Sequence, residues 1–296
     1  MTRRDEVRQL LTLDPGEVVE RAGDRLEVCE DLDALHRRFA ELVFDDIQTA
    51  ARAHTLCRLI LPVGPTGGYE PLAERINASS AALDHCRFFF MDEYCDENGH
   101  AVDVSHPLSF KGVMRDLFFR RLDSMAALAD APDEAGVNVA DAGSGPAQVW
   151  FPDQDNIDKL AGEIRENGGI DTCYGGIGIH GHVAFNEPEP GVADSGPRKV
   201  RLNDFTVTIN AARAEVGGNL ECFPREAYTL GMRQILESRR IVLFCRNGTD
   251  FDWANTVLRL ALFGEPGDDY PVTHIRDHTY LIVTDRETLS RPRTQL

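Results

Sequence analysis

The chain has very little lysine, which occurs only at Lys111, Lys159 and Lys199, so most of its positive charge is arginine. Asp and Glu number 49 against 31 Lys and Arg, which gives a formal net charge of −18 at pH 7. Because such a surface repels nucleic acid and anionic membranes, we expect neither as a partner. The same field repels phosphate esters, so a phosphate ligand would need strong local hydrogen-bond donors. The acid excess fits either salt adaptation or biased codon usage.

Long apolar runs are also missing. No segment approaches the roughly 20 apolar residues that a membrane-spanning helix requires, and the charged N-terminal stretch MTRRDEVRQLLTLDPGE lacks the apolar core of a secretory signal. The seven cysteines are scattered and form no C-x-x-C pair. Most of them lie in apolar runs, where reduced cysteine packs as a small hydrophobe. These absences predict a cytoplasmic protein with free thiols.

Short apolar segments alternate with amphipathic ones along the chain. We expect helices over 32–50, 70–82, 107–122, 154–167, 225–238 and 251–263. We expect strands over 58–63, 87–91, 171–176, 205–209, 240–245 and 279–284, and an exposed loop over 130–147. This alternation predicts an α/β fold in which a doubly wound, mostly parallel sheet forms the middle layer of a three-layer α/β/α sandwich. We expect residues 1–30 to be an N-terminal extension and residues 31–296 to be a single domain.

A glycine-rich turn follows the first predicted strand of that domain. The segment Val63-Gly-Pro-Thr-Gly-Gly68 leads from this strand into a helix. Glycines allow close ligand approach, and free N–H groups at a helix start attract phosphate. Gly64, Thr66, Gly67 and Gly68 are therefore candidate phosphate-binding residues, although an ordinary tight turn that needs glycine is equally consistent with the pattern.

Asp92 directly follows the next predicted strand. A carboxylate at the carboxyl end of a strand, beside the apolar run Arg87-Phe-Phe-Phe-Met91, can have its pKa raised into the range of a general base. A helix cap or a solvated acidic turn is the alternative, because Asp96, Glu97 and Asn98 continue the polar stretch.

The third cluster is Gly175-Gly-Ile-Gly-Ile-His-Gly-His-Val-Ala-Phe-Asn-Glu-Pro188, after the strand at 171–176. His182 with Glu187 supplies a proton carrier and an orienting carboxylate. His180 and His182 could also bind a metal. Since no other His or Cys is near in sequence, we expect no metal. A glycine turn with an exposed imidazole remains the alternative, more for His180 than for His182.

Several motifs resemble those of glucosamine-6-phosphate deaminases. Met91-Asp-Glu-Tyr94, Ser105-His-Pro-Leu-Ser109 and Gly181-His-Val-Ala-Phe-Asn-Glu-Pro188 are similar to signature segments of this family. Tyr228-Thr-Leu-Gly-Met-Arg-Gln-Ile-Leu236 resembles the helix that follows the family's next strand. The resemblance runs from about residue 32 to about residue 285 in the family's order. The related 6-phosphogluconolactonases share the glycine turn and Gly-His but usually lack both Met-Asp-Glu-Tyr and Phe-Asn-Glu-Pro.

The resemblance implies a reaction and roles for matched positions. Asp92 matches the base that moves a proton between C2 and C1 of the opened amino sugar. His182 matches the group that assists ring opening, and Glu187 the carboxylate paired with it. Isomerisation of glucosamine 6-phosphate gives an imine whose hydrolysis yields fructose 6-phosphate and ammonia. No cofactor is expected, because each step is a proton transfer or an addition of water. The family contains both monomers and closed oligomers, so a homo-oligomer is possible.

Three positions depart from the family pattern. His180 stands where the family has an Asp, so we expect His182 to be mostly neutral near pH 7 and activity on glucosamine 6-phosphate to be weak. The glycine turn is rearranged, and the phosphate-binding Lys of the family has no counterpart. Arg246 is the nearest cation, and Arg213 matches a substrate Arg of the family with a small gap. Arginine binds phosphate as a planar fork, so this replacement is not neutral.

These departures leave two alternatives open. In a 6-phosphogluconolactonase-like hydrolase, His182 would activate water, and Asp92 and Glu187 would be less necessary. A sugar-phosphate-binding protein that has lost catalysis would be compatible with His180 and the missing Lys. The joint presence of Asp92, His182 and Glu187 favours the isomerase and deaminase interpretation.

Overall fold

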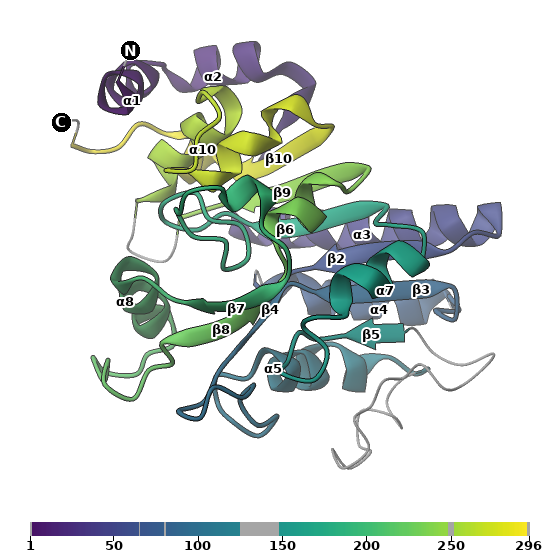
Figure 1. Cartoon of the computed structure of the whole chain (residues 1–296). Helices are drawn as coiled ribbons and strands as arrows, with labels where there is room; N and C mark the ends of the chain where they lie inside the picture. The colour runs from purple at the N-terminus through teal and green to yellow at the C-terminus, as the bar shows by residue number, and fades with distance from the viewer. Residues whose placement is uncertain (1, 65, 80, 125–147, 248–251, 295–296) are drawn as a thin grey trace.

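The computed structural model describes residues 2–64, 66–79, 81–124, 148–247 and 252–294. Its main sheet has seven strands, all paired in parallel, in the order β1-β10-β9-β6-β2-β3-β5 (Figure 1). These strands are β1 (Leu26–Cys29), β2 (Cys57–Leu61), β3 (Cys86–Phe90), β5 (Gln148–Trp150), β6 (Thr172–Gly176), β9 (Arg240–Cys245) and β10 (Tyr280–Asp285). This arrangement confirms the predicted parallel sheet.

Helices cover both faces of the sheet. One face packs against α3 (Leu32–Ala53), α4 (Tyr69–Ser79) and α5 (Phe110–Leu117). The other packs against α1 (Arg3–Leu11), α2 (Pro15–Ala22), α7 (Leu160–Glu166), α9 (Met232–Leu236), α10 (Ala254–Phe263) and α11 (Arg286–Leu289). Successive residues of a strand pack into the hydrophobic cores on opposite faces of the sheet. Leu59 and Leu61 face α3, for example, while Ile60 faces the other layer. The three-layer sandwich is therefore confirmed. None of the described helices is long and apolar enough to cross a membrane.

A small antiparallel sheet lies beside the main one (Figure 1). Its order is β4-β8-β7, formed by β4 (Asp92–Tyr94), β8 (Glu226–Thr229) and β7 (Arg198–Arg201). Helix α8 (Asp204–Arg213) packs on it through Val207 and Ala211, which join a core with Tyr94 and Ala227. Because β4 begins two residues after β3 ends, this sheet brings α8 to the carboxyl edge of the main sheet.

The strand order reverses beside β2. From β2 the chain continues to β3 and β5 on one side, whereas β6, β9 and β10 lie on the other. At such a switch point the connections diverge and leave a crevice beyond the carboxyl ends of the two central strands. Here these ends carry Pro62-Val63-Gly64 after β2 and Ile177-Gly178 after β6.

The first 30 residues contact the domain extensively. Leu26 pairs with Ile282, so β1 is an edge strand of the main sheet. Arg3 forms an ion pair with Asp269, with 2.8 Å between Nε and Oδ2. The carbonyl of Leu13 accepts a hydrogen bond from Arg259. This segment thus closes one edge of the sandwich.

Two predicted elements are wrong. Residues 205–209 form part of α8 and not a strand, because the Asn203 side chain caps the helix and the buried Val207 and Ala211 are spaced four apart. The run Thr-Val-Thr-Ile has strand propensity, which the cap and tertiary packing override.

The predicted helix over 225–238 is instead β8 followed by the short α9. Gly231 separates them in a place without room for a side chain, since a Cβ there would lie 2.0 Å from the carbonyl oxygen of Ser195. The regions 107–122 and 154–167 are helical only over α5 and α7, apart from a short 3-10 turn after α5. The loop predicted over 130–147 lies outside the described residues.

Candidate active site

A cavity of about 170 Å³ occupies the switch point. Five predicted site residues line it: Gly64, Asp92, His182, Arg213 and Arg246. The rest of its lining is Pro62, Val63, Met91, Phe110, Gly176, Ile177, Gly178, Ala184, Phe185, Asn210 and Phe244. The lining therefore combines one carboxylate, one imidazole and two guanidinium groups with glycines and apolar side chains.

Asp92 is placed in the cavity by the backbone of its neighbours. Met91 bonds to the carbonyl of Leu61 in β2, and Asp92 pairs with Thr229 of β8. The Asp92 side chain is buried, and within the described part of the chain no hydrogen-bond donor to it is recorded. Burial foremost, and then the charge of Glu93, raise the pKa of Asp92 to about 8. An unpartnered carboxyl with a pKa near neutrality is suited to accept a proton from a bound ligand.

Glu93, the next residue, has a structural task. Its carboxylate accepts hydrogen bonds from Ser109 Oγ at 3.1 Å and from the backbone N–H groups of Phe110 and Lys111 at 3.0 and 2.9 Å. These bonds fix the start of α5, so that Phe110 lies against the cavity. Of the two adjacent carboxylates, only Asp92 is free for chemistry.

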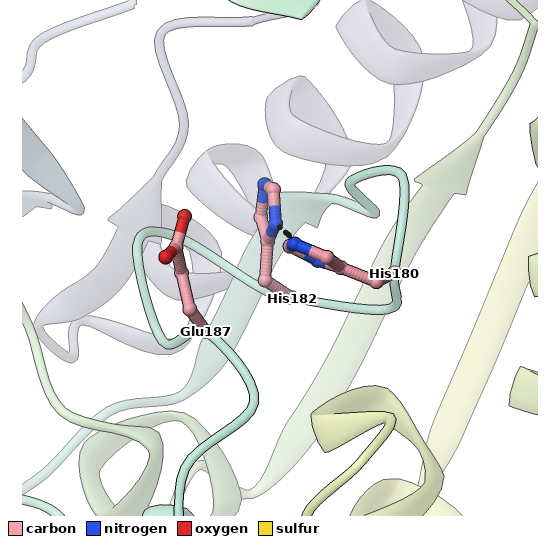
Figure 2. Close-up of side chains that lie close together, drawn as sticks. All are labelled: His180, His182 and Glu187. Atoms are coloured by element: carbon pink, nitrogen blue, oxygen red, sulfur yellow. Dashed lines mark hydrogen bonds between the residues drawn. The ribbon is translucent and has the colours of Figure 1, made fainter. Parts of the chain in front are cut away.

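The two histidines lie in a tight loop after β6. Gly178 N–H donates to the His182 carbonyl, and Gly181 adopts a positive φ of 74°. The loop is tied to β8, because Asn186 donates to the carbonyl of Leu230 at 2.9 Å. His182 Nδ1 lies 3.2 Å from His180 Nδ1 (Figure 2). Burial, His180 and the charge of Arg213 lower the pKa of His182 to about 3, so His182 is neutral at pH 7, as predicted.

Asn203, which the sequence analysis did not single out, connects this loop to α8. Its side chain contacts His180 Nε2 at 2.6 Å, and its backbone N–H donates to Glu187 at 2.6 Å. Glu187 Oε1 is buried and has no hydrogen-bond partner among the described residues. Burial raises the pKa of Glu187. Glu187 and His180 lie on either side of His182 (Figure 2) and do not line the cavity.

His180, His182 and Glu187 are also a possible metal-ligand set, since one ligand atom from each lies within 4.8 Å of the others. A metal-bound imidazole normally donates its second ring N–H to an acceptor. The second ring nitrogen of His180 instead meets the side chain of Asn203. The donor end of the Asn203 amide faces it, because Asn203 Oδ1 already accepts from Thr206 N–H at 3.0 Å. This contact favours a hydrogen-bonded histidine pair.

The glycine turn is only partly in the cavity. Gly64 lines it, whereas Thr66, Gly67 and Gly68 are absent from the described lining. A Cβ on Gly67 would lie 2.4 Å from His36 Nδ1, and one on Gly68 would lie 2.4 Å from Phe39 Cδ1. These two glycines therefore let the turn pack on α3, which is a structural requirement that the sequence did not reveal.

Arg213 and Arg246 give the cavity its positive charge. Within the residues that the structure describes, neither forms an ion pair. Burial foremost, and then the charge of Arg246, lower the pKa of Arg213 to about 10. Its guanidinium lies 5.2 Å from the ring centre of Trp253, which holds it in place. Arg246 is half-buried and Arg213 is exposed, and the mutual repulsion of these two cations favours binding of an anion between them.

Asn210 is a further lining residue missed by the sequence analysis. Its Nδ2 donates to Tyr94 Oη at 3.0 Å. Asn210 and Arg213 are three residues apart on α8 and so share one helix face. The spacing of the polar residues Asn203, Asn210 and Arg213 could have indicated a shared helix face. This signal was lost because the segment was predicted to be a strand.

Comparisons with known proteins identify the family of the chain. No family model matches the chain. A glucosamine-6-phosphate deaminase from Caenorhabditis elegans is 30% identical over 221 residues, which are 74% of this chain and 74% of the relative. One from Rhodopirellula baltica is 28% identical over 253 residues, covering 86% of this chain and 89% of the relative.

Solved structures agree in fold. A monomeric glucosamine-6-phosphate deaminase superposes with a TM-score of 0.72 at 22% identity, covering 89% of this chain and 98% of the other. A 6-phosphogluconolactonase from Thermotoga maritima superposes with a TM-score of 0.59 at 17% identity, covering 88% and 99%. The relative that is 30% identical over 74% of both chains shows that the chain belongs to the glucosamine-6-phosphate deaminase family.

Proposed function

We propose that the chain isomerises and deaminates an amino-sugar phosphate of the glucosamine 6-phosphate type, giving a ketose phosphate and ammonia. The observation that carries the proposal is the buried carboxyl of Asp92, which accepts no hydrogen bond from the described residues, in a cavity that also holds two arginines without an ion-pair partner among those residues. A base and an anion site in one small cavity suit a phosphorylated sugar whose acidic C–H lies next to a carbonyl.

In the proposed reaction, Asp92 takes the proton from C2 of the open-chain amino sugar and returns it to C1. This converts the C1 aldehyde to an alcohol and leaves an imine at C2. Water then adds to C2, and ammonia leaves to give the ketone. Every step is a proton transfer or an addition of water, so the proposal includes no cofactor.

The proposed phosphate site consists of the Gly64 turn, Arg213 and Arg246. Gly64, Arg213 and Arg246 line the cavity, and Gly64 has open space on its side-chain face. A phosphate there would relieve the repulsion between the two guanidinium groups, and arginine can bind it with two parallel hydrogen bonds.

The same proposal places the protein in the cytoplasm. All seven cysteines are free thiols and six of them are buried. A reducing compartment preserves such thiols.

Two assays on the purified protein test the proposal. We expect ammonia and a ketose phosphate to form in equal amounts from an amino-sugar 6-phosphate, and 6-phosphogluconolactone to be hydrolysed no faster than in buffer. Lactone hydrolysis without ammonia release from any amino-sugar phosphate would overturn it. The matched control is Asp92→Asn, which should abolish ammonia release and leave the fold intact.

A further inference from the structure

A chain of hydrogen bonds behind His182 begins at the cap of α8. Asn203 Oδ1 accepts the Thr206 N–H at 3.0 Å, as an N-cap side chain does. Because the oxygen of the amide is used in this way, its NH₂ group is the end that faces His180 Nε2, 2.6 Å away. Since an amide NH₂ can only donate, His180 Nε2 must accept and carries no proton.

The position of the remaining protons follows from this. A neutral His180 without a proton on Nε2 carries it on Nδ1. His180 Nδ1–H then donates to His182 Nδ1 at 3.2 Å. His182 Nδ1 is thereby an acceptor, and the proton of the neutral His182 ring is on Nε2.

The Nε2 atom of His182 is on the cavity side. Figure 2 shows one nitrogen of the His182 ring toward His180 and the other turned away from it. A Cβ on Gly178 would lie 1.9 Å from His182 Nε2, so this nitrogen lies against a residue that lines the cavity. No hydrogen bond from Nε2 to another described residue is recorded, which leaves its N–H for a ligand.

We propose that Asn203 and His180 are positioning residues that hold His182 as a neutral Nε2–H donor, so that His182 stabilises charge on the substrate oxygen during isomerisation and does not act as a base. The role in catalysis rests on the proposed function, whereas the tautomer does not. When Asp92 removes the C2 proton, the electron pair forms the C1–C2 double bond and the carbonyl pair moves onto the C1 oxygen. His182 Nε2–H donates a hydrogen bond to that oxygen.

The rest of the step balances without another reactant. The C1 oxygen takes a proton from the substrate's own ammonium group, and Asp92 returns its proton to C1, which leaves the C2 iminium. A neutral imidazole is an effective electrophile in such a step when it remains uncharged throughout. The lowered pKa of His182 agrees with this requirement.

The charged groups around His182 are compatible with a neutral ring that carries its proton on Nε2. Arg213 on α8 and Arg246 after β9 share the cavity with it and disfavour a second proton. Asp92 on β4 has a raised pKa, and Glu187 is held by Asn203 N–H. One consequence is that His182 cannot take a proton from the anomeric hydroxyl, so it does not act as the base in ring opening.

The tautomer can be measured in the free enzyme by ¹⁵N NMR of histidine-labelled protein. We expect a protonated-type signal for His182 Nε2 and an unprotonated-type signal for Nδ1 at pH 7. This measurement needs neither substrate nor turnover. The reverse pattern in wild-type protein would overturn the proposal, even if ammonia is released as proposed. The expected tautomer in a protein that releases no ammonia would instead count against the proposed function alone.

Asn203→Ser provides the second test. Ser keeps the cap of α8 but has no NH₂ group for His180. We expect both tautomers of His182 to appear and kcat to fall about 2- to 10-fold with little change in KM, as for the loss of one hydrogen bond. Asp14→Ser is the matched control, because Asp14 caps α2 away from the cavity, and it should change neither quantity. A single unchanged tautomer with unchanged kcat in Asn203→Ser would contradict the proposal.

Discussion

At the scale of single residues, Asp92 governs the pH dependence of activity. Its pKa of about 8 means that most of the free enzyme holds Asp92 protonated at pH 7, and a base must be deprotonated. We expect kcat/KM to rise with pH through about 8. Asp92→Asn should lower kcat by about 10²- to 10⁴-fold, because an amide cannot accept the C2 proton. A pH–rate profile of wild type checks the first expectation, and the kcat of Asp92→Asn checks the second. Near-wild-type turnover by Asp92→Asn would refute the role of Asp92 as the base.

The same carboxyl affects stability in the opposite direction. Because folding raises the pKa of Asp92, the folded protein binds a proton that the unfolded chain has already lost between pH 4 and 8. Its contribution to the free energy of unfolding is therefore present at low pH and disappears as pH rises through about 8. We expect Asp92→Asn to gain stability relative to wild type as pH increases from 5 to 9. Urea unfolding of wild type and Asp92→Asn at pH 5 and at pH 9 measures this change. A difference in free energy of unfolding between the two proteins that is the same at both pH values would contradict the raised pKa.

His180→Asp tests the departure from the family pattern. A carboxylate at this position would accept hydrogen bonds from both Asn203 and His182 Nδ1 and would raise the pKa of His182. A charged His182 keeps its Nε2–H and can also give a proton to the ring oxygen of a closed sugar. We therefore expect the variant to release ammonia from glucosamine 6-phosphate faster than wild type. The idea fails if wild-type protein already acts on this sugar with kcat/KM in the usual range of about 10⁴–10⁸ M⁻¹ s⁻¹.

Sequence reasoning succeeded where chemistry follows a strand end. Asp92 and His182 each follow a short apolar strand, and parallel topology alone requires both to reach one edge. Asn203 could not be predicted, because its role depends on the direction of its amide, which a helix cap fixes. The function of Gly67 and Gly68 was equally hidden, since their closest neighbours are on α3, about 30 residues away in sequence.

At the scale of elements, the misassigned segments share a cause. β4, β7 and β8 are only 3 to 4 residues long, too short for a periodic pattern to identify. In 205–209 the β-branched residues indicate a strand, yet α8 forms because its cap and one buried face are satisfied. The apolar runs predicted β2, β3, β6, β9 and β10 of the large sheet, since these strands are largely buried on both faces. The edge strands β1 and β5 were not predicted, because they are only 4 and 3 residues long and are only partly buried.

Gly231 and Gly162 make a matched pair for testing this element-level account. A Cβ at Gly231 would collide with the backbone of Ser195 and Gly196, which cannot move aside as a side-chain end can. We expect Gly231→Ala to reduce the free energy of unfolding by about 1–3 kcal/mol or more. Gly162 is inside α7 with no atom within 4 Å of the added Cβ, so Gly162→Ala should gain about 0.5–1 kcal/mol. Denaturant unfolding of both variants checks the signs, and equal effects would contradict the collision.

At the scale of the whole molecule, the protein carries a large net negative charge, but its cavity is positively charged. The net charge of −18 repels a sugar phosphate at long range, while Arg213 and Arg246 attract it only within the cavity. Salt screens the long-range repulsion between exposed charges over about 8–10 Å, but it screens buried charges much less. The approach of the substrate and its final binding should therefore respond differently to ionic strength.

We expect kcat/KM for an amino-sugar phosphate to increase as a neutral salt is raised from about 10 to 150 mM, the range over which the Debye length falls from about 30 to 8 Å. Most enzymes with anionic substrates and cationic surfaces show the opposite trend, since salt weakens their steering. Arg213→Gln should raise KM at every salt concentration and leave the upward slope in place, because it removes the local attraction and not the surface charge. A falling kcat/KM in wild-type protein would mean that the two arginines, and not the acidic surface, control the encounter.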